Sequence, residues 1–333
     1  MSLEILMGKK ILFFSPAFFN YENVIADKMR AMGAYVDMFD ERSVNKAFDR
    51  ALLKITPRLF IKRTQRYYEN ILENVKERDY DYIFIIKCDM TPDCILKKIQ
   101  DIFPRAIKCL YLYDSVANIP GIVSKFKYFD KLYSFDSCDC QKYPVLKFRP
   151  LFFSDQFRRD YRRNKHCKYD ISFLGTVHSD RFAIIKKMQD FAVKNHLNCY
   201  WFLYLQSEFI YWFYKVTKRE FWNVSKNVFS FEKISMDKIA NIVDNSKIIL
   251  DIQHPKQTGL TMRTIEMIGM HKKIITTNSL IKNYDFYNPN NIAIIERNNA
   301  LLDRCFLYGE YEPLSESIYE KYSLKNWISD ILS

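Results

Sequence analysis

Glycine is scarce in this chain, with 7 among 333 residues, or about 2% against a usual ~7%. The scarcity excludes collagen-like chains, Gly-rich linkers and most β-barrels. No G-x-G-x-x-G and no G-x-x-x-x-G-K-[ST] sequence occurs, so neither a dinucleotide-binding fingerprint nor a P-loop is present. An uncharged run of 18 apolar residues is also lacking, and no transmembrane helix is expected.

The eight cysteines contain no C-x-x-C pair, and the only close pair is Cys138 and Cys140. No secretory signal is recognised, so free thiols in a reducing cytoplasm are expected. Cys138, Cys140 and His166 could bind a metal, but small buried side chains near strand ends are the favoured interpretation. We therefore expect no metal and no other cofactor.

Lysine and arginine exceed the acidic residues, and the formal net charge is +12. Such a surface favours anionic partners: nucleotides, nucleic acid, acidic glycans or lipid headgroups. Hydrophobic residues make up 48% and charged residues 27% of the chain, which is typical of folded soluble proteins. The length suggests two domains, each able to bury its own core.

The apolar segments alternate with helical ones. Strands are predicted in the first half at residues 10–15, 34–40, 82–87, 107–114 and 131–136, and in the second half at 169–175, 199–205, 248–253, 273–278 and 291–296. This β-α-β order predicts an α/β protein with two parallel, Rossmann-like sheets joined by right-handed crossovers. Gly33 is expected to end the first helix.

Domain boundaries follow from the same pattern. We expect domains at residues 1–150 and 169–312, joined by a basic linker at 151–168. A single helix from about 314 to 332, within a terminal segment of 313–333, could pack back on the first domain. Ligands of such sheets bind beyond the carboxyl ends of the strands.

Asp114 follows an apolar strand of the first domain. A carboxylate there could deprotonate an acceptor hydroxyl as a general base. It could equally cap a helix or stabilise a turn, and both interpretations stay open. His178 and His254 are weaker alternatives for the same chemistry.

The most informative stretch runs from residue 254 to 278. A strand ends, a loop carries Lys256 and Gly259, and a helix starts near Thr261. Backbone amides at a helix start suit a phosphate, and Gly259 lets the backbone approach it closely. Lys256 and Arg263 could neutralise a diphosphate. Glu266 could accept hydrogen bonds from a ribose diol; a solvated helix glutamate is the competing interpretation.

The segment "TGLTMRTIEMIGMHKKII" resembles the donor site of GT-B glycosyltransferases, which commonly reads E-G-F-G-L-T-x-x-E-A-M-A-x-G-K-P-V-I. Gly259 falls on the first glycine, Thr261 on the second, and Glu266 on the second glutamate, the usual ribose ligand. The first glutamate is replaced by Thr258. That departure bears on which hydroxyls of the donor sugar are held.

A closer resemblance, from about residue 80 to 295, is to the CgeB-like (group 1) glycosyltransferases of bacterial surface polysaccharide and spore-coat gene clusters. It is carried by "CLYLYDS", "YDISFLGTVHSDR" and "GLTMRTIE". The resemblance implies a GT-B architecture, with two Rossmann-like domains facing each other across a cleft. Residues 1–150 would bind the acceptor and residues 169–312 the nucleotide-sugar donor.

The resemblance also places Gly175 and Thr176 in a turn against the donor diphosphate, with Arg181 reaching a phosphate. An ordinary turn with a helix-start arginine is the other interpretation. Asp79 to Asp81 spells the D-x-D of metal-dependent transferases, but it precedes a strand instead of following one. We reject it and expect a metal-independent enzyme, in which cations and helix amides stabilise the leaving nucleotide.

The favoured function is a glycosyltransferase moving a sugar from a nucleotide-sugar to a glycan or lipid-linked acceptor, in bacterial cell-surface polysaccharide or lipopolysaccharide synthesis. One alternative is a catalytically inactive GT-B-like binding or scaffolding subunit. Another is a basic nucleic-acid-binding protein, which the charge alone suggests. No recognisable reading motif supports it, so nucleic acid is not an expected partner.

Residues 209–222 interleave aromatic side chains with Lys215, Lys218 and Arg219. This pattern predicts a peripheral contact with an anionic membrane, although the aromatics could instead cover the core. The expected location is the cytoplasm, including the inner face of the cell membrane.

Overall fold

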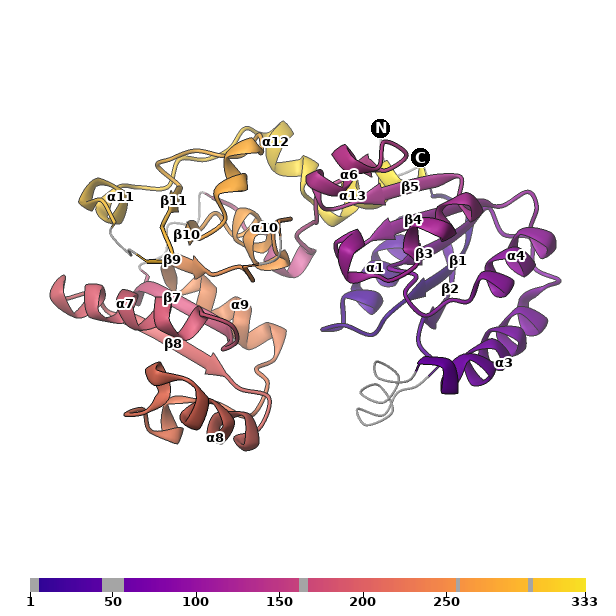
Figure 1. The fold of residues 1–333 in the computed structure, drawn as a ribbon. Coiled ribbons are helices and arrows are strands. Elements are labelled where there is room, and N and C mark those ends of the chain that lie inside the picture. Colours follow the sequence, from indigo (N-terminus) through magenta and orange to yellow (C-terminus); the bar gives the residue numbers. More distant parts are fainter. Residues whose placement is uncertain (1–5, 44–56, 162–166, 256–257, 299–301) are drawn as a thin grey trace. The chain divides into compact units, whose positions relative to one another are not determined.

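The computed structural model describes residues 6–43, 57–161, 167–255, 258–298 and 302–333. The chain divides into two compact units (Figure 1). Unit 1 comprises Met1–Pro150 with Leu324–Ser333, and unit 2 comprises Leu151–Ser323. Each unit is a parallel sheet with helices, so the predicted α/β fold with two Rossmann-like sheets is confirmed.

Unit 1 contains a six-stranded parallel sheet with the order β2-β1-β3-β4-β5-β6. Its strands are β1 (Lys10–Ser15), β2 (Tyr35–Asp40), β3 (Tyr82–Ile86), β4 (Ile107–Leu112), β5 (Lys131–Ser134) and β6 (Lys147–Phe148). Every residue of β3 is buried, as its continuous apolar run predicts for a strand covered on both faces.

In the described part of unit 1, helices and short turns follow the strands in the chain, and the last helix returns to this unit after unit 2. The helices are α1 (Tyr21–Ala31), α3 (Pro57–Val75), α4 (Asp93–Ile102), α5 (Ile122–Lys125), α6 (Ser137–Lys142) and α13 (Leu324–Leu332), with 3-10 turns η1 (Val116–Asn118) and η2 (Phe126–Tyr128). Gly33 follows α1 with φ +95°, which confirms it as the helix stop. A Cβ added to Gly33 would lie 2.8 Å from Met7 Sδ.

Helix α13 packs on the sheet of unit 1. Trp327 is fully buried, with its ring centroid 4.7 Å from that of Tyr111 and 5.9 Å from that of Phe84. Tyr133 Oη donates a hydrogen bond to Asp330 O at 3.0 Å. The last helix of the chain is therefore part of the core of unit 1.

Unit 2 contains a five-stranded parallel sheet with the order β11-β10-β9-β7-β8. Its strands are β7 (Tyr169–Thr176), β8 (Cys199–Tyr204), β9 (Ser246–Asp251), β10 (Lys273–Thr276) and β11 (Ile292–Ile294). Its helices are α7 (Arg181–Lys194), α8 (Glu208–Thr217), α9 (Met236–Asp244), α10 (Met262–Gly269), α11 (Arg304–Tyr308) and α12 (Glu316–Lys321), with 3-10 turns η3 (Asp155–Phe157), η4 (Arg219–Phe221), η5 (Lys226–Val228) and η6 (Ser279–Asn283).

The segment expected as a linker, residues 151–168, belongs to unit 2. Arg159 N donates to Gly269 O at 3.0 Å, and the Arg159 guanidinium pairs with Asp244 at 2.9 Å. Arg158 forms a bidentate pair with Glu320. These arginines are tied into the unit by partners distant in sequence, instead of forming the solvated face that a linker would present.

The single helix expected from 314 to 332 is two helices, α12 and α13, which lie in different units. The break falls at Tyr322 and Ser323. Tyr322 O accepts a hydrogen bond from Phe153 N at 2.9 Å, and Phe153 forms a β-bridge with Ser323. Pairing with a distant strand segment therefore takes the backbone out of the helix. No helix in the described ranges is long and apolar enough to cross a membrane.

Both sheets share one topological feature. In unit 1 the chain adds β2 on one side of β1 and the later strands, from β3 onward, on the other side, so the strand order reverses between β1 and β3. In unit 2 it reverses in the same way between β7 and β9. Ligands of open α/β sheets bind beyond the carboxyl ends of the strands at such a switch point. The loops after β1, β3, β7 and β9 are therefore the places to look for functional groups.

Candidate functional site

The loops at the switch points contain strained backbone. Phe19 and Asn20 after β1, Lys87 and Cys88 after β3, and Ser179 after β7 all have φ between +50° and +75°. Non-glycine residues seldom adopt this left-handed conformation. In a chain with so little glycine, these turns are made by residues that have side chains. Such strain gathers at functional sites, which supports the positions chosen from topology.

Arg181 lies at the switch point of unit 2, at the start of α7. Its Nη1 donates to Thr176 O at 3.1 Å, and Thr176 and Gly175 are the last residues of β7. Burial lowers the pKa of Arg181, although the nearby Asp251 acts in the opposite direction. The guanidinium nevertheless stays charged at neutral pH. Its Nε is buried and has no hydrogen-bond partner among the described residues.

A second arginine, Arg297, joins three loops of this edge. It follows β11, and its Nη1 contacts both carboxylate oxygens of Asp180, at 2.9 and 2.8 Å. Its Nη2 donates to Gln253 O at 3.0 Å. Arg297 therefore fixes the loops after β7 and β9 relative to one another. The sequence analysis missed it because its only signal is its place just after the last strand.

Thr261 is the N-cap of α10, close to where the sequence predicts the helix start. Its Oγ1 accepts a hydrogen bond from Thr264 N at 3.2 Å. The same hydroxyl donates to Asp251 Oδ2 at 3.1 Å, and Thr264 Oγ1 donates to that oxygen as well. The Thr261 side chain is therefore engaged in holding the end of β9 to the start of α10.

Glu266 is buried inside unit 2, with 2% of its surface exposed. Its Oε2 lies 3.3 Å from Arg263 Nη1, one helical turn earlier. The interpretation of Glu266 as a solvated helix glutamate is therefore wrong. Arg263, expected to meet a diphosphate, is instead paired with the expected ribose ligand.

The loop between β9 and α10 is described in part. Lys256 lies outside the described residues. Gly259 is buried, and the neighbouring Thr258 O accepts a hydrogen bond from Asn278 Nδ2 at 3.1 Å. Asn278 follows β10, so its amide ties the loops after β9 and β10 together.

Three buried polar atoms at this edge have no hydrogen-bond partner in the described part of the chain. They are Arg181 Nε, Gln253 Oε1 and Thr277 Oγ1. Leaving such a group unpaired costs about 1–3 kcal/mol, and native proteins contain few of them. A polar ligand bound at the carboxyl edge of the second sheet would supply the missing partners.

His178 also lies in the loop after β7, and its ring centroid is 5.4 Å from that of His254. Burial, followed by the charge of Arg181, lowers the pKa of His178 to about 4. The imidazole is therefore neutral at pH 7. An anion bound beside Arg181 would act in the opposite direction, because it favours the charged imidazolium.

In unit 1, Asp114 lies just beyond the end of β4. Its Oδ1 accepts hydrogen bonds from Ser115 N at 3.0 Å and Asn118 Nδ2 at 2.9 Å. Its Oδ2 lies 3.4 Å from Lys87 Nζ. The first pair of contacts stabilises the turn that follows, as the structural interpretation expects. The second oxygen, Oδ2, faces the Lys87 ammonium group, so the general-base interpretation also remains.

The switch point of unit 1 contains a pair of carboxyl groups, Asp89 after β3 and Glu41 after β2, of which the sequence analysis missed Glu41. Asp89 Oδ2 lies 3.3 Å from Lys87 Nζ and 3.8 Å from Arg42 Nη2. Beneath it, Glu41 is fully buried and its Oε1 accepts a hydrogen bond from Met90 N at 2.9 Å. Burial, then the charge of Asp89, raises the pKa of Glu41 well above its ordinary value. Glu41 follows β2, and only that position hinted at it.

Residues considered for a metal do not gather. Among the described residues no three His, Cys, Asp or Glu side chains are arranged to bind a metal ion. Cys138 is exposed, and His166 lies outside the described residues. Asp79 and Asp81 precede β3, at the amino edge of the sheet. Asp81 pairs there with Lys9 at 2.7 Å.

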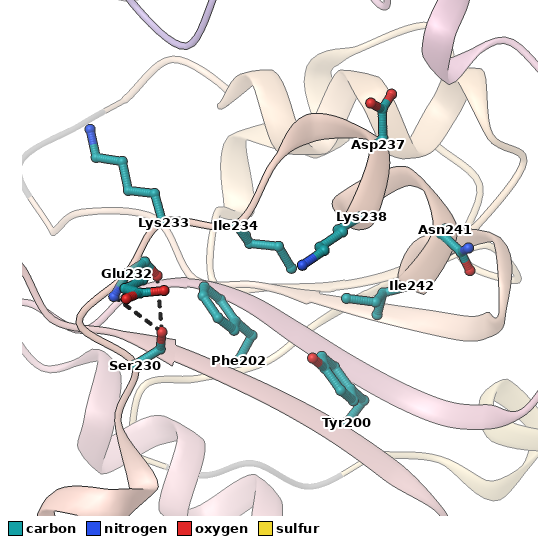
Figure 2. A pocket seen from close by; sticks show the side chains of 10 residues that line it. All are labelled: Tyr200, Phe202, Ser230, Glu232, Lys233, Ile234, Asp237, Lys238, Asn241 and Ile242. Atoms are coloured by element: carbon teal, nitrogen blue, oxygen red, sulfur yellow. Dashed lines mark hydrogen bonds between the residues drawn. The ribbon is translucent and has the colours of Figure 1, made fainter.

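A pocket of about 490 Å³ lies elsewhere in unit 2, between edge strand β8 and α9. Figure 2 shows Tyr200 and Phe202 of β8 beside Ile234, Lys238 and Ile242. Its size is in the range of small-molecule sites. It contains none of the residues that the sequence predicts for the donor, so the predicted donor site is a separate place.

Comparisons with known proteins identify the fold. HepE from Anabaena, solved in complex with UDP-glucose, has a TM-score of 0.59 and 10% identity, over 97% of this chain and 98% of that one. Sucrose-phosphate synthase from Thermosynechococcus elongatus has a TM-score of 0.57 and 8% identity, over 98% and 95%. The N-terminal domain of Candida albicans trehalose-6-phosphate phosphatase has a TM-score of 0.58 and 11% identity, over 99% and 97%.

At such low identity these likenesses show the fold alone, and that fold is GT-B. No family model matches the sequence, and no curated protein matches it either.

Proposed function

We propose that the chain is a glycosyltransferase that moves a sugar from a nucleotide-sugar donor to a hydroxyl of a glycan or lipid-linked acceptor. The observation that carries the proposal is the group of unpartnered buried polar atoms at the carboxyl edge of the second sheet. The GT-B fold supports it, since one structure of this fold, that of HepE, holds UDP-glucose.

The donor nucleotide would bind in unit 2. Arg181, with Nε unpaired in the described chain, would donate to the diphosphate together with the amides at the start of α10. Gly175 and Thr176, at the end of β7, would lie against the diphosphate, and the sequence offers Lys256 as a further cation. Glu266 would accept hydrogen bonds from the ribose, which requires the Arg263–Glu266 pair to share its carboxylate with the ligand.

The acceptor would bind in unit 1, at the carboxyl edge of its sheet. Asp114 would take the proton of the attacking hydroxyl through Oδ2, the oxygen that faces Lys87. The leaving nucleotide diphosphate gains negative charge as the glycosidic bond breaks, and Arg181 would stabilise that charge. No metal enters this scheme.

The resemblance to CgeB-like glycosyltransferases supports a role in bacterial surface polysaccharide or lipopolysaccharide synthesis. The reaction would then take place in the cytoplasm, because nucleotide-sugars are the donors.

Calorimetric titration with UDP, GDP, CMP and dTDP tests the donor site. We expect one nucleotide to bind the wild type, and Arg181→Ala to weaken that binding tenfold or more, because a charge-assisted contact is worth ~1.5–3 kcal/mol. Arg304→Ala removes an exposed arginine of the same unit and serves as the matched control. Absence of binding by all four nucleotides, or equal losses in both variants, would reject the site.

Incubation with the matching nucleotide-sugar then separates transfer from mere binding. Release of the free nucleotide, with transfer or slow hydrolysis of the sugar, supports the enzyme. Tight binding without any turnover would indicate the inactive scaffold. A salt-dependent shift of RNA or DNA mobility without nucleotide binding would indicate the nucleic-acid-binding alternative.

A further inference from the structure

Helix α8 exposes a continuous row of large apolar side chains. Phe209, Trp212, Phe213 and Val216 are exposed to between 55% and 80%. Their spacing of three and four residues places them on one side of the helix. We refer to these four residues as the α8 outer face. Trp222, in the turn after η4, is exposed to 56%.

The opposite side of α8 is already packed. Tyr211 is buried, and its ring centroid lies 5.8 Å from that of Phe229. Tyr214 lies 5.2 Å from Phe221, which is fully buried. The inner side therefore attaches α8 to the core of unit 2, and the α8 outer face is not needed for that attachment. Helices that are apolar on all sides are normally covered on all sides.

A row of this kind on the surface needs an explanation. Single exposed apolar residues are common, but a contiguous patch marks an interaction site. Two phenylalanines and a tryptophan dominate the α8 outer face. Tryptophan is enriched where a protein meets the headgroup level of a membrane, and a helix with one apolar side exposed is the form that lies in that interface.

Charge supports a lipid surface as the occupant. Arg219 follows α8, is exposed, and forms no ion pair with any described residue. Lys226 is neutralised by Glu208, whose Oε2 lies 3.0 Å from its Nζ, so Arg219 is the cation that this segment offers to lipid phosphates. The chain as a whole has a net charge of +12. Each basic side chain near an anionic bilayer contributes to attraction.

The sequence pattern predicts that Lys215 and Lys218 contact lipid, whereas in the structure both side chains bind backbone carbonyl groups of unit 2. Lys215 Nζ donates to Val224 O at 3.1 Å, and Lys218 Nζ donates to Ser179 O at 2.6 Å. Both ammonium groups are thus occupied in holding α8 and its following turn on unit 2. Replacing them by glutamate would disturb the fold, so they are poor positions for a test of lipid binding.

We propose that the α8 outer face, with Trp222 beside it, docks unit 2 on an anionic membrane surface. The aromatic rings enter the headgroup level, and Arg219 meets the lipid phosphates. This inference does not depend on the proposed transfer reaction, since it rests on exposure and charge at a separate helix.

Co-sedimentation with vesicles tests the proposal. Vesicles of zwitterionic lipid with about one third anionic lipid should pellet the wild type, and the double variant Trp212→Ser/Phe213→Ser should reduce the pelleted fraction fivefold or more. Val193→Ser, which removes an apolar side chain exposed to 75% on α7, is the matched control and should pellet like the wild type. Equal thermal unfolding of all three proteins shows that the fold is intact.

Two charge-reversal variants test whether the protein prefers anionic lipid. Arg219→Glu should weaken pelleting, whereas Lys282→Glu, an exposed lysine outside this segment, should not. Failure of the wild type to pellet at low salt would overturn the proposal, as would equal pelleting of the double variant. Light scattering that finds a wild-type dimer, lost in the double variant, together with no vesicle binding, would instead assign the α8 outer face to a second copy.

Discussion

Glu41 and Asp89 form a hydrogen-bonded carboxyl pair, and one oxygen of each group, Glu41 Oε2 and Asp89 Oδ1, is buried and has no other hydrogen-bond partner among the described residues. Two ionised carboxylates cannot share such a place, so one of them holds a proton. Burial raises the pKa of Glu41. Burial acts the same way on Asp89, but Lys87, Glu41 and Arg42 together hold its pKa below the ordinary range. The proton therefore resides on Glu41.

Stability should consequently fall as the pH rises above the ordinary pKa of Glu41, 4.5. Above that value the unfolded chain releases the proton and the folded chain retains it, so the free energy of unfolding decreases until the folded pKa is reached. Glu41→Gln mimics the protonated form and removes this dependence. Denaturant unfolding at pH 5 and pH 8 should show that the free energy of unfolding of the variant, relative to that of the wild type, is higher at pH 8 than at pH 5.

Glu73→Gln, at an exposed glutamate of unit 1, is the control and should show no such gain. Parallel stability curves for wild type and Glu41→Gln would contradict a proton held on Glu41. Asp89 has a lowered pKa, so its ionisation changes the free energy of unfolding only below its ordinary pKa of 3.8. That range lies outside the comparison between pH 5 and pH 8.

The Arg263–Glu266 pair allows the ribose assignment to be separated from a structural role. Glu266→Ala should weaken nucleotide binding tenfold or more through loss of a charged acceptor, worth ~1.5–3 kcal/mol. It also leaves Arg263 without this partner, which lowers stability. The double variant Arg263→Ala/Glu266→Ala removes both charges. Calorimetry should find the double variant as weak as Glu266→Ala, whereas recovery of the affinity would show that Glu266 acts only through Arg263.

Transfer activity should persist in excess EDTA. Arg181 provides a fixed positive charge where the leaving diphosphate is proposed to lie, and Asp79 and Asp81 lie at the amino edge of the first sheet, opposite to the carboxyl edge where ligands of such sheets bind. Turnover assayed with and without chelator checks this. Complete loss that Mn²⁺ or Mg²⁺ restores would mean that the cation is inorganic.

Gly33 and Gly8 both have positive φ, +95° and +73°, but only Gly33 is crowded, by Met7. Alanine in left-handed backbone costs roughly 1–2 kcal/mol. Gly8→Ala should cost about that much, because nothing lies within 4 Å of the added Cβ. Gly33→Ala should cost more, since Met7 must also move. Denaturant unfolding of the two variants should give that order; equal losses would show that Met7 adapts freely.

Local patterns in the sequence predicted the sheets well, because strand burial and helix stops depend on neighbours in the chain. Gly33 and the start of α10 near Thr261 are examples. Features that depend on distant partners were not predictable. Arg159 looked like a solvated residue because its partner Asp244 lies 85 positions away. No glycine or proline at Tyr322 indicates the break between α12 and α13, which arises from the pairing of this segment with Phe153.

The same limit applied to the candidate site. Asp114 was predicted from its place after a strand and Arg181 from the resemblance to GT-B glycosyltransferases, and both stay predictions. The burial of Glu266 and the pairing of Glu41 with Asp89 were not predicted, because amphipathic spacing does not tell which polar residue of a helix or strand end faces inward.

The placement of α13 in unit 1 has a consequence for biosynthesis. Residues 324–332 are translated after all of unit 2, yet Trp327 fills the core against Tyr111 and Phe84. On the ribosome, unit 2 has its complete set of residues before unit 1 does, although unit 1 begins first. The emerging first sheet must therefore wait, with the apolar surface that α13 covers still exposed, until residues 324–332 leave the exit tunnel. If translation stalls before residues 324–332 are made, unit 1 would present an exposed apolar surface to which a chaperone could bind.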